Sequence, residues 1–256
     1  MVTTASGAWP AGPGLKAGVV PPVGSAGRRL TRVNLVAACS FVLGGALFAL
    51  GAAFAQFGID TLTVNVTYLV GGFFFSLGGY ASILLCADGS DVSDPPDAER
   101  TRWWSSRPER LAWRSAVVLF VGTLLFAVSL VAALAQGLTP RQSNGWIWLP
   151  DILGCLCFLV SGHLAMLDVG DGRIRVRADV LGWWVVAVNQ LGSVLFFLAG
   201  IAAFTRPATD QAINTGLVNW GTFAGAACFT VGGVIQAFDT PTPTRTVVQP
   251  RHDTTQ

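Results

Sequence analysis

The sequence predicts an all-α, polytopic membrane protein with six transmembrane helices, arranged as three tandem parallel-repeat hairpins. Three observations predict this class. Apolar residues make up 52% of the 256 residues and charged residues only 12%, whereas soluble domains carry about 25% charged residues. The apolar residues fall into six segments long enough to cross a bilayer, in agreement with a mean hydropathy of +0.56. One short motif recurs in all six segments.

The length of each apolar segment justifies it as a span, because about 20 apolar residues cross a ~30 Å hydrocarbon core. The six segments are 33–57, 62–87, 113–136, 146–167, 183–204 and 213–238. Each is apolar around its whole circumference, as a helix surrounded by lipid or buried in a bundle should be. They pair into hairpins 30–87, 112–168 and 182–238, within a transmembrane domain that we expect to cover 30–238.

The first span has an alternative interpretation as a cleaved signal peptide. Arg28 and Arg29 precede an apolar run that reaches Ala53-Phe54-Ala55, a sequence with small residues at cleavage-site spacing. The run is longer than the roughly 7–15 residues of a signal-peptide core, and it carries the same motif as the other five spans. Both facts favour a retained helix.

The distribution of positive charge predicts the direction of the spans. All but two of the 16 Lys and Arg residues lie before the first span, between spans two and three, between spans four and five, or after the sixth, with Arg114 counted at the membrane edge of the third span. The exceptions, Arg141 and Arg206, lie in the loops on the other side. We therefore expect both termini in the cytoplasm and the protein in the plasma membrane.

Both chain ends are predicted to be disordered. Residues 1–29 are rich in Gly, Ala and Pro and show no apolar period, so we expect a disordered cytoplasmic arm. Residues 239–256 are rich in Pro and Thr and are expected to form a disordered cytoplasmic tail.

The motif is Gly-x-x-x-Phe-x-(Leu/Val)-(Gly/Ser/Ala), and it lies near the middle of every span. Its anchors are Gly44/Phe48/Gly51, Gly71/Phe75/Gly78, Gly122/Phe126/Ser129, Gly154/Phe158/Ser161, Gly192/Phe196/Ala199 and Gly225/Phe229/Gly232. At about 100° per residue the three anchors share one helix face. Lipid gives no hydrophobic drive for helices to associate, so small residues that allow close van der Waals contact are favoured at their interfaces. The motif therefore predicts a packing seam within each hairpin.

The seam also predicts a register. In the first hairpin, antiparallel packing is expected to bring Gly44 level with Gly78 and Gly51 level with Gly71. Each hairpin crosses the membrane twice, so the three repeats share one orientation and are parallel rather than inverted. The alternative is that the motif lines a pore.

No constellation of residues indicates catalysis or cofactor binding. Histidine occurs only at His163 and His252, which leaves no bis-histidine haem site and no His-rich metal site. Cys155 and Cys157 are two residues apart and face different sides of a helix, and the chain has no C-x-x-C, G-x-S-x-G, H-E-x-x-H or phosphate-loop motif. We expect no enzymatic activity, no cofactor and no metal. The net charge of +2 is too small to indicate a nucleic-acid partner.

Polar side chains inside the spans are candidate functional contacts, because they are costly to place in a membrane. The four candidates are Asn65, Asn189, Asn219 and His163. Asn65 and Asn219 each precede a motif glycine by six residues, whereas Asn189 and Asp151 precede theirs by three. One role is an interhelical hydrogen bond, which contributes about 0.6–2 kcal/mol. The other is contact with a substrate or ion.

The third hairpin resembles a known family. The residues that carry the resemblance are Trp183-Trp184, Asn189, Leu191-Gly192-Ser193, Phe196, Asn219, Gly221-Thr222-Phe223, Gly225, Cys228-Phe229 and Gly232. Over 182–238 they resemble the YrhK-like domain, a two-helix membrane unit found in integral membrane proteins of actinobacteria. The first two hairpins share only the Gly/Phe core with it. The resemblance implies a hairpin architecture and no particular activity, substrate or catalytic residue.

Two functional hypotheses follow. The first is a non-enzymatic structural or interaction bundle, whose partners are the lipid bilayer and a membrane protein or a second copy of the chain. The second is a small transporter or channel for a neutral or lipid-like substrate, with Asn65, Asn189 and Asn219 along a pathway between the hairpins. The absence of paired intramembrane charges in the sequence weighs against ion coupling.

Overall fold

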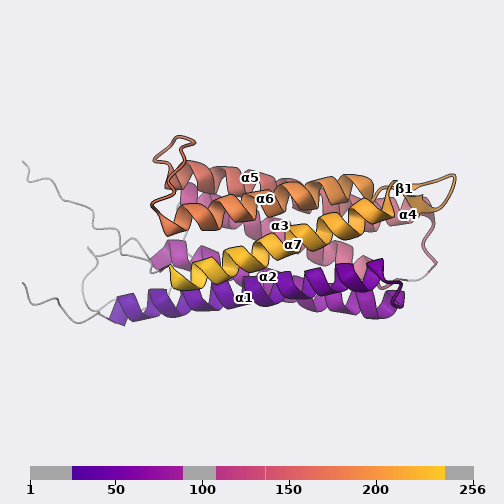
Figure 1. Ribbon diagram of the computed structural model, residues 1–256, viewed down its shortest axis with the longest axis horizontal. Coiled ribbons are helices and arrows are strands. Elements are labelled where there is room, and N and C mark those ends of the chain that lie inside the picture. Colours follow the sequence, from indigo (N-terminus) through magenta and orange to yellow (C-terminus); the bar gives the residue numbers. More distant parts are fainter. Residues whose placement is uncertain (1–24, 89–107, 136, 240–256) are drawn as a thin grey trace, which may run out of the picture.

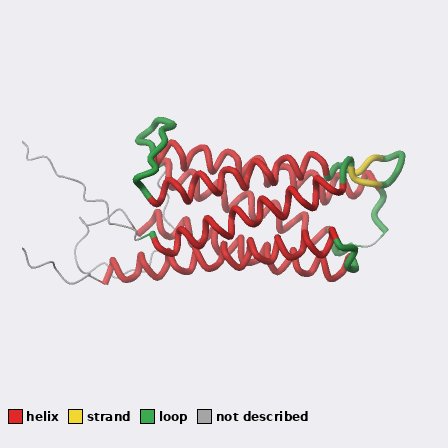
Figure 2. The backbone as a smooth tube through the Cα atoms, viewed as in Figure 1, coloured by secondary structure: helices red, strands yellow, loops and turns green. Residues whose placement is uncertain are grey.

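The computed structural model describes residues 25–88, 108–135 and 137–239, and within them the chain is a bundle of six long helices (Figures 1 and 2). The long helices are α1 (Ser25–Gln56), α2 (Thr61–Asp88), α3 (Leu111–Ala132), α5 (Leu149–Val169), α6 (Leu181–Ala202) and α7 (Thr215–Phe238). All six are long and apolar enough to cross a membrane. The predicted all-α class with six spans is thus confirmed, and the chain is a multi-pass membrane protein.

Short elements complete the described chain. Helix α4 (Pro140–Ser143) and the π-helical turn η1 (Asn144–Trp148) lead directly into α5, while β1 (Thr205–Arg206) and β2 (Gln211–Ala212) pair as an antiparallel ribbon between α6 and α7.

Asp60 begins α2 as its N-cap: its carboxylate accepts a 2.9 Å hydrogen bond from the Thr63 backbone N–H. That bond holds the pKa of Asp60 below its usual value.

Two helix starts differ from the predicted bounds. Helix α1 begins at Ser25, so residues 25–29 are helical rather than part of a disordered arm. The last proline of the arm is Pro22, so no proline stands between it and the first span. The remainder of the predicted arm and the predicted tail beyond Asp239 lie outside the described residues.

The fourth span begins at Pro140 instead of 146. Thr139 forms a capping box with Gln142, and Pro140 occupies the first turn of the helix, where its missing N–H costs nothing. The π-helical turn lies immediately before Pro150, and the Leu149 N–H bonds to the Asn144 carbonyl five residues back. A proline removes one helical hydrogen bond, and the wider turn accommodates it.

The six long helices form a closed ring. Each packs against the next along the chain, in the order α1, α2, α3, α5, α6 and α7, and α7 packs back against α1. All run along the same long axis (Figure 1). We call the end with the start of α1 and the end of α7 the terminal end. The opposite end, with the α1–α2 turn, α4 and the β1–β2 ribbon, is the distal end (Figure 2).

The first and last helices close the ring at very short range. A methyl group added at Gly45 would lie 2.8 Å from the Ala226 carbonyl oxygen, and one added at Gly233 would lie 3.0 Å from that of Ala38. Only glycine allows the two backbones to approach this closely. Polar pairs fasten the interface at each end, Asn34 with Gln236 and Gln56 with Asn219.

The outward faces of the helices are apolar. Large exposed hydrophobic side chains lie on all six, among them Leu35, Phe73, Val131, Val160, Leu191 and Val231. Such faces are compatible with lipid rather than water as the surrounding solvent. Apart from His163, the polar side chains discussed below lie on the inward side or at the ends.

The predicted register within the first hairpin is wrong. Gly44 lies opposite Gly71 and Phe75, not opposite Gly78, and Gly71 lies against Phe48. Gly51 instead faces Tyr68, and Gly78 faces Phe41. The predicted register would have set the two bulky Phe-bearing turns level with each other. The observed one is displaced by roughly one helical turn and places each phenylalanine over a glycine of the neighbouring helix.

Candidate functional site: two cavities and a phenylalanine plug

The motif residues pack in the same reciprocal way in three consecutive helix pairs. In α1/α2 the Phe48 ring covers Gly71, and the Phe75 ring covers Gly44. The equivalent contacts join the glycines and phenylalanines of α3/α5 and α6/α7: Phe126 on Gly154, Phe158 on Gly122, Phe196 on Gly225 and Phe229 on Gly192. The predicted packing seam is therefore present, and each glycine provides the space for one ring.

The six motif phenylalanines also meet one another at the centre of the ring. Within the pairs, ring centroids are 5.2 Å apart for Phe48–Phe75, 5.1 Å for Phe126–Phe158 and 5.4 Å for Phe196–Phe229. Contacts between pairs are Phe48–Phe196, Phe126–Phe196, Phe75–Phe158, Phe75–Phe229 and Phe158–Phe229, with ring centroids 5.5–6.3 Å apart. These contacts join helices that are not neighbours in the ring, so the rings lie on its axis.

We call these six side chains the phenylalanine plug. All six are nearly fully buried. A gap of only about 10 Å³ remains among them, lined in part by Gly72 and Thr123, which is at the lower limit for a single water molecule. In this conformation the plug closes the axis near the middle of the spans.

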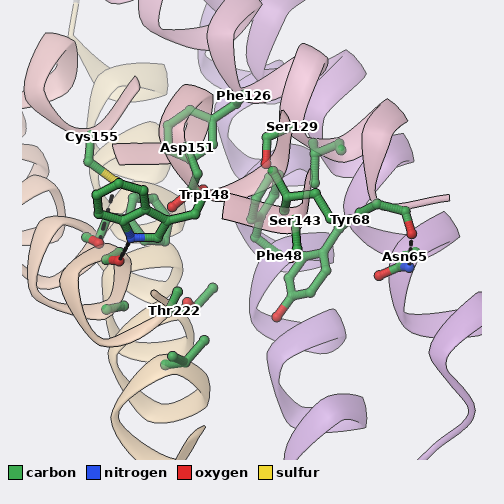
Figure 3. Close-up of a pocket in the computed structure, with 18 of the residues that line it drawn as sticks. Phe48, Asn65, Tyr68, Phe126, Ser129, Ser143, Trp148, Asp151, Cys155 and Thr222 are labelled. Atoms are coloured by element: carbon green, nitrogen blue, oxygen red, sulfur yellow. Dashed lines mark hydrogen bonds between the residues drawn. The ribbon is translucent and has the colours of Figure 1, made fainter. Parts of the chain in front are cut away.

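The distal cavity, of about 230 Å³, lies on one side of the plug. Phe48, Phe126 and Phe196 form its floor. Its walls include Tyr68, Asn65, Trp148, Asp151, Ser143 and Thr222. Figure 3 shows that these side chains converge from several helices, with Asn65 and Tyr68 on α2 and Trp148 and Asp151 at the η1–α5 junction.

The terminal cavity, of about 380 Å³, lies on the other side of the plug. Phe158 and Phe229 of the plug line it. Its other walls include Phe41, Leu119, Ser82, Cys86, Ser161, Asn189, Asp168 and Asp239. The axis of the ring thus carries two cavities, one toward each end, and the phenylalanine plug separates them.

One position in the motif accounts for much of both linings. The residue three before the motif glycine is Tyr68 in α2, Asp151 in α5 and Thr222 in α7, and all three line the distal cavity. The same position in the oppositely directed helices is Phe41 in α1, Leu119 in α3 and Asn189 in α6, and all three line the terminal cavity. The distal set is polar, whereas the terminal set is mostly apolar.

Of the four predicted polar contacts, two line a cavity. Asn65 lines the distal cavity, where its Nδ2 donates a 2.7 Å hydrogen bond to the Ala133 carbonyl at the end of α3. Asn189 lines the terminal cavity. Asn219 is buried and donates to the Gln56 side chain at 3.1 Å, between α7 and α1. His163 is exposed on the outside of α5 and lines neither cavity.

Asn189 and Gln190 carry the buried side-chain oxygens that lack a hydrogen-bond partner among the described residues. The Asn189 amide faces Gly232, where an added methyl group would lie 2.1 Å from its Oδ1. Gln190 donates a long, 3.4 Å bond from Nε2 to the Leu159 carbonyl. The terminal cavity therefore contains unused hydrogen-bonding capacity at Asn189.

Asp151 is the acidic side chain that lines the distal cavity. Its carboxylate lies beside Gly200, where an added methyl group would be 3.3 Å from Oδ2. Within the described part of the chain it forms no hydrogen bond and no ion pair. The neighbouring N–H donors are occupied elsewhere: Trp148 Nε1 donates to the Gly200 carbonyl at 2.9 Å. A carboxylate without a partner in such a cavity is a candidate ligand-binding group.

Tyr68 and Thr222 are lining residues that the sequence interpretation missed. The polar candidates from the sequence were amides, His163 and acidic groups. Tyr68 and Thr222 nevertheless stand three residues before their motif glycines, as Asp151 and Asn189 do, so this spacing also selects the two hydroxyl side chains.

Among the described residues no three His, Cys, Asp or Glu side chains gather as a metal-binding group. No family model, curated protein or solved structure matches the chain. The resemblance of 182–238 to the YrhK-like domain stays a prediction.

Proposed function

We propose that the protein is a non-enzymatic plasma-membrane protein that passes a small solute along the axis of its helix ring, with the phenylalanine plug as the gate. One observation carries this proposal. Two cavities with polar lining residues reach the plug from opposite ends of the bundle, and different rings of the plug line each of them. A bundle that only packs has no need for two coaxial cavities separated by a hydrophobic constriction. Hydrophobic constrictions are a known means of gating.

The charge distribution gives the pathway a direction. The terminal end carries Arg28, Arg29 and Arg110 as well as the 173–177 arginines, while the distal end carries Arg141 and Arg206. By the positive-inside rule the terminal end faces the cytoplasm. The distal cavity is then the external entrance and the terminal cavity the internal one.

A sealed structural or interaction bundle is the second candidate. The reciprocal Gly/Phe contacts and the gap of only about 10 Å³ within the plug favour it. In that case the lipid bilayer, a membrane-protein partner or a second copy of the chain is the functional contact. The two candidates differ in whether water reaches both cavities from opposite sides.

Cysteine labelling tests the proposal. On a background without the native cysteines, Ser143→Cys reports on the distal cavity and Ser82→Cys on the terminal one. Both changes replace an oxygen by a sulfur and alter little volume. We expect a membrane-impermeant thiol reagent to label S143C only from outside and S82C only from inside. The matched control is Asn219→Cys, which lies between α1 and α7 and should stay unlabelled.

The outcomes separate the two candidates. Labelling of each cavity from its own side supports a gated pathway. If neither folded variant reacts while both react after unfolding, the bundle is sealed and the transport proposal is wrong. Labelling of both positions from the same side contradicts the proposed gate position.

A further inference from the structure

The chemistry of the distal cavity indicates what kind of solute it accepts. We propose that it binds a small organic ammonium ion, with the Asp151 carboxylate as counter-ion and the surrounding aromatic rings as the second attraction. This inference rests on the proposed function, because it names the substrate class of the external entrance. Binding itself, however, needs only the cavity and not an open gate.

The first argument is charge. Asp151 lines the cavity and has no hydrogen-bond or ion-pair partner in the described part of the chain. No Lys, Arg or His lines the cavity with it. The arginines at this end point elsewhere: Arg141 is exposed, and Arg206 donates a 2.9 Å hydrogen bond to the Ile213 carbonyl. A negative charge placed this way is stabilised by a cation from outside.

The second argument is the balance of donors and acceptors. The amide of Asn65 and the indole of Trp148 already donate to backbone carbonyls within the protein, and the Cys155 thiol donates to the Phe196 carbonyl. What remains for a ligand is the Asp151 carboxylate and the hydroxyls of Tyr68 and other walls. These hydroxyls can donate or accept, whereas the carboxylate only accepts and repels an anion, so a positively charged ligand that donates hydrogen bonds is matched.

The third argument is the aromatic lining. Five of the lining residues are Phe48, Tyr68, Phe126, Trp148 and Phe196, and Figure 3 shows the Tyr68 and Trp148 rings in the same cavity as Asp151. Aromatic rings attract a desolvated ammonium group through their quadrupole, and Trp and Tyr do so well. Water-coordinated metal cations would lose more hydration energy in such a lining than an alkylammonium ion.

The terminal cavity differs at the equivalent positions. There the residues three before the motif glycines are Phe41, Leu119 and Asn189, in place of Tyr68, Asp151 and Thr222. The carboxylates of that cavity, Asp168 and Asp239, belong to the last residues at the terminal end. Cation recognition next to the plug is therefore confined to the distal side.

Titration calorimetry of the purified full-length protein in an uncharged detergent tests the inference. The probes are tetramethylammonium, choline and propylammonium, and the neutral comparator is 3,3-dimethylbutan-1-ol, which has the shape of choline without its charge. We expect at least one of the three ions to bind and the alcohol to bind at least about tenfold more weakly, because the alcohol leaves the carboxylate unpaired.

Variants locate the site. Asp151→Asn should weaken ammonium binding by at least about tenfold, while Asp151→Glu keeps the charge and should retain part of the affinity. The matched control is Asp210→Asn, an exposed carboxylate at the same end that does not line the cavity. Asp210 has a φ of 55°, which asparagine also tolerates. A thermal unfolding curve for each variant verifies the fold.

Three results would overturn the inference: none of the ions binds, the alcohol binds as tightly as choline, or D151N binds as tightly as the unaltered protein. These results are distinguishable from failure of the transport proposal. If ammonium binding fails while S143C and S82C label from opposite sides, the pathway stands with another solute. If binding succeeds while S82C stays unlabelled, the distal cavity is a binding site without a through pathway.

Discussion

At the scale of single residues, the pairing of glycine with phenylalanine determines how the helices meet. An added methyl group at Gly71 would lie 2.8 Å from the Phe48 ring and 3.2 Å from the Gly44 carbonyl oxygen. The sequence pattern correctly identified both residue types as packing anchors. It could not supply the register, because a pattern that places small and large residues on one face is compatible with several alignments of two antiparallel helices.

Replacement of Gly71 by leucine should overpack this seam. We expect Gly71→Leu to lower the free energy of unfolding by roughly 1–3 kcal/mol, measured by reversible unfolding in mixed micelles. The matched control is Gly145→Leu, because a side chain at Gly145 meets nothing within 4 Å. Equal stability of G71L and G145L would contradict the observed close contact.

The candidate site was also partly visible at this scale. Asp151 and Asn189 share a spacing of three residues to their glycines, and both line cavities. Asn219 and His163 are polar too, but Asn219 donates its hydrogen bond to Gln56 and His163 lies on the outer face of α5. Polarity alone therefore does not locate the site. The direction of the side chain relative to the ring axis decides, and spacing to the motif glycine does not always supply it: Asn65 and Asn219 both precede their glycines by six residues, yet only Asn65 lines a cavity.

At the scale of elements, the helices were predictable and their ends were less so. Hydropathy located all six spans because the bilayer requires about 20 apolar residues from each. The early start of the fourth span depends on local chemistry that hydropathy does not register, namely the Thr139 capping box and Pro140. Likewise, the pairing of α1 with α7 joins segments about 200 residues apart, and nothing in their local patterns indicates it.

The Asn34–Gln236 pair should contribute measurably to that long-range interface. Asn34 Nδ2 donates to the Gln236 backbone carbonyl at 3.0 Å, and the Gln236 side chain donates from Nε2 to Asn34 Oδ1 at 3.1 Å. Only the second bond joins the two side chains, so it is the one that the coupling energy reports. In a double-mutant cycle of Asn34→Leu and Gln236→Leu we expect a coupling energy of about 0.5–2 kcal/mol. The control cycle pairs Gln236→Leu with Asn65→Leu at the distal end, and those effects should add. Additivity in both cycles would show that the bond between the two side chains contributes nothing.

At the scale of the whole molecule, closure of the ring creates both the plug and the cavities. The sequence placed one phenylalanine in the middle of every span, but their meeting on a common axis depends on the ring order of the helices. That order follows from side-chain packing between segments distant in the chain. The predicted tandem repeat is consistent with three equivalent Gly/Phe contacts and stays a prediction in itself.

Removal of one plug ring should open the constriction. Phe75 contacts the rings of Phe48, Phe158 and Phe229 within the plug, whereas Phe73 on the same helix is 66% exposed on the outer face. In liposomes we expect Phe75→Ala to raise glycerol permeability severalfold and Phe73→Ala to leave it unchanged. Osmotic shrinkage followed by light scattering measures this.

The plug variant also has a stability cost. Truncation of a buried phenylalanine typically costs about 3–5 kcal/mol, so the melting temperature of F75A must be shown to lie above the assay temperature. A folded F75A with unchanged permeability would show that the plug is not the barrier.

Because α1 and α7 are in close contact, the chain is suited to circular permutation. The first and last helices are neighbours in the ring and begin and end at the same end of the bundle (Figure 1), so every one of the six helices has two neighbours and no interface marks where the chain starts. A circular permutant that links the end of α7 to the start of α1 and opens the exposed turn at 170–180 would keep all six helix–helix interfaces. In this permutant the third hairpin would be synthesised first. The order in which the helices enter the membrane would then change while the final architecture stays the same.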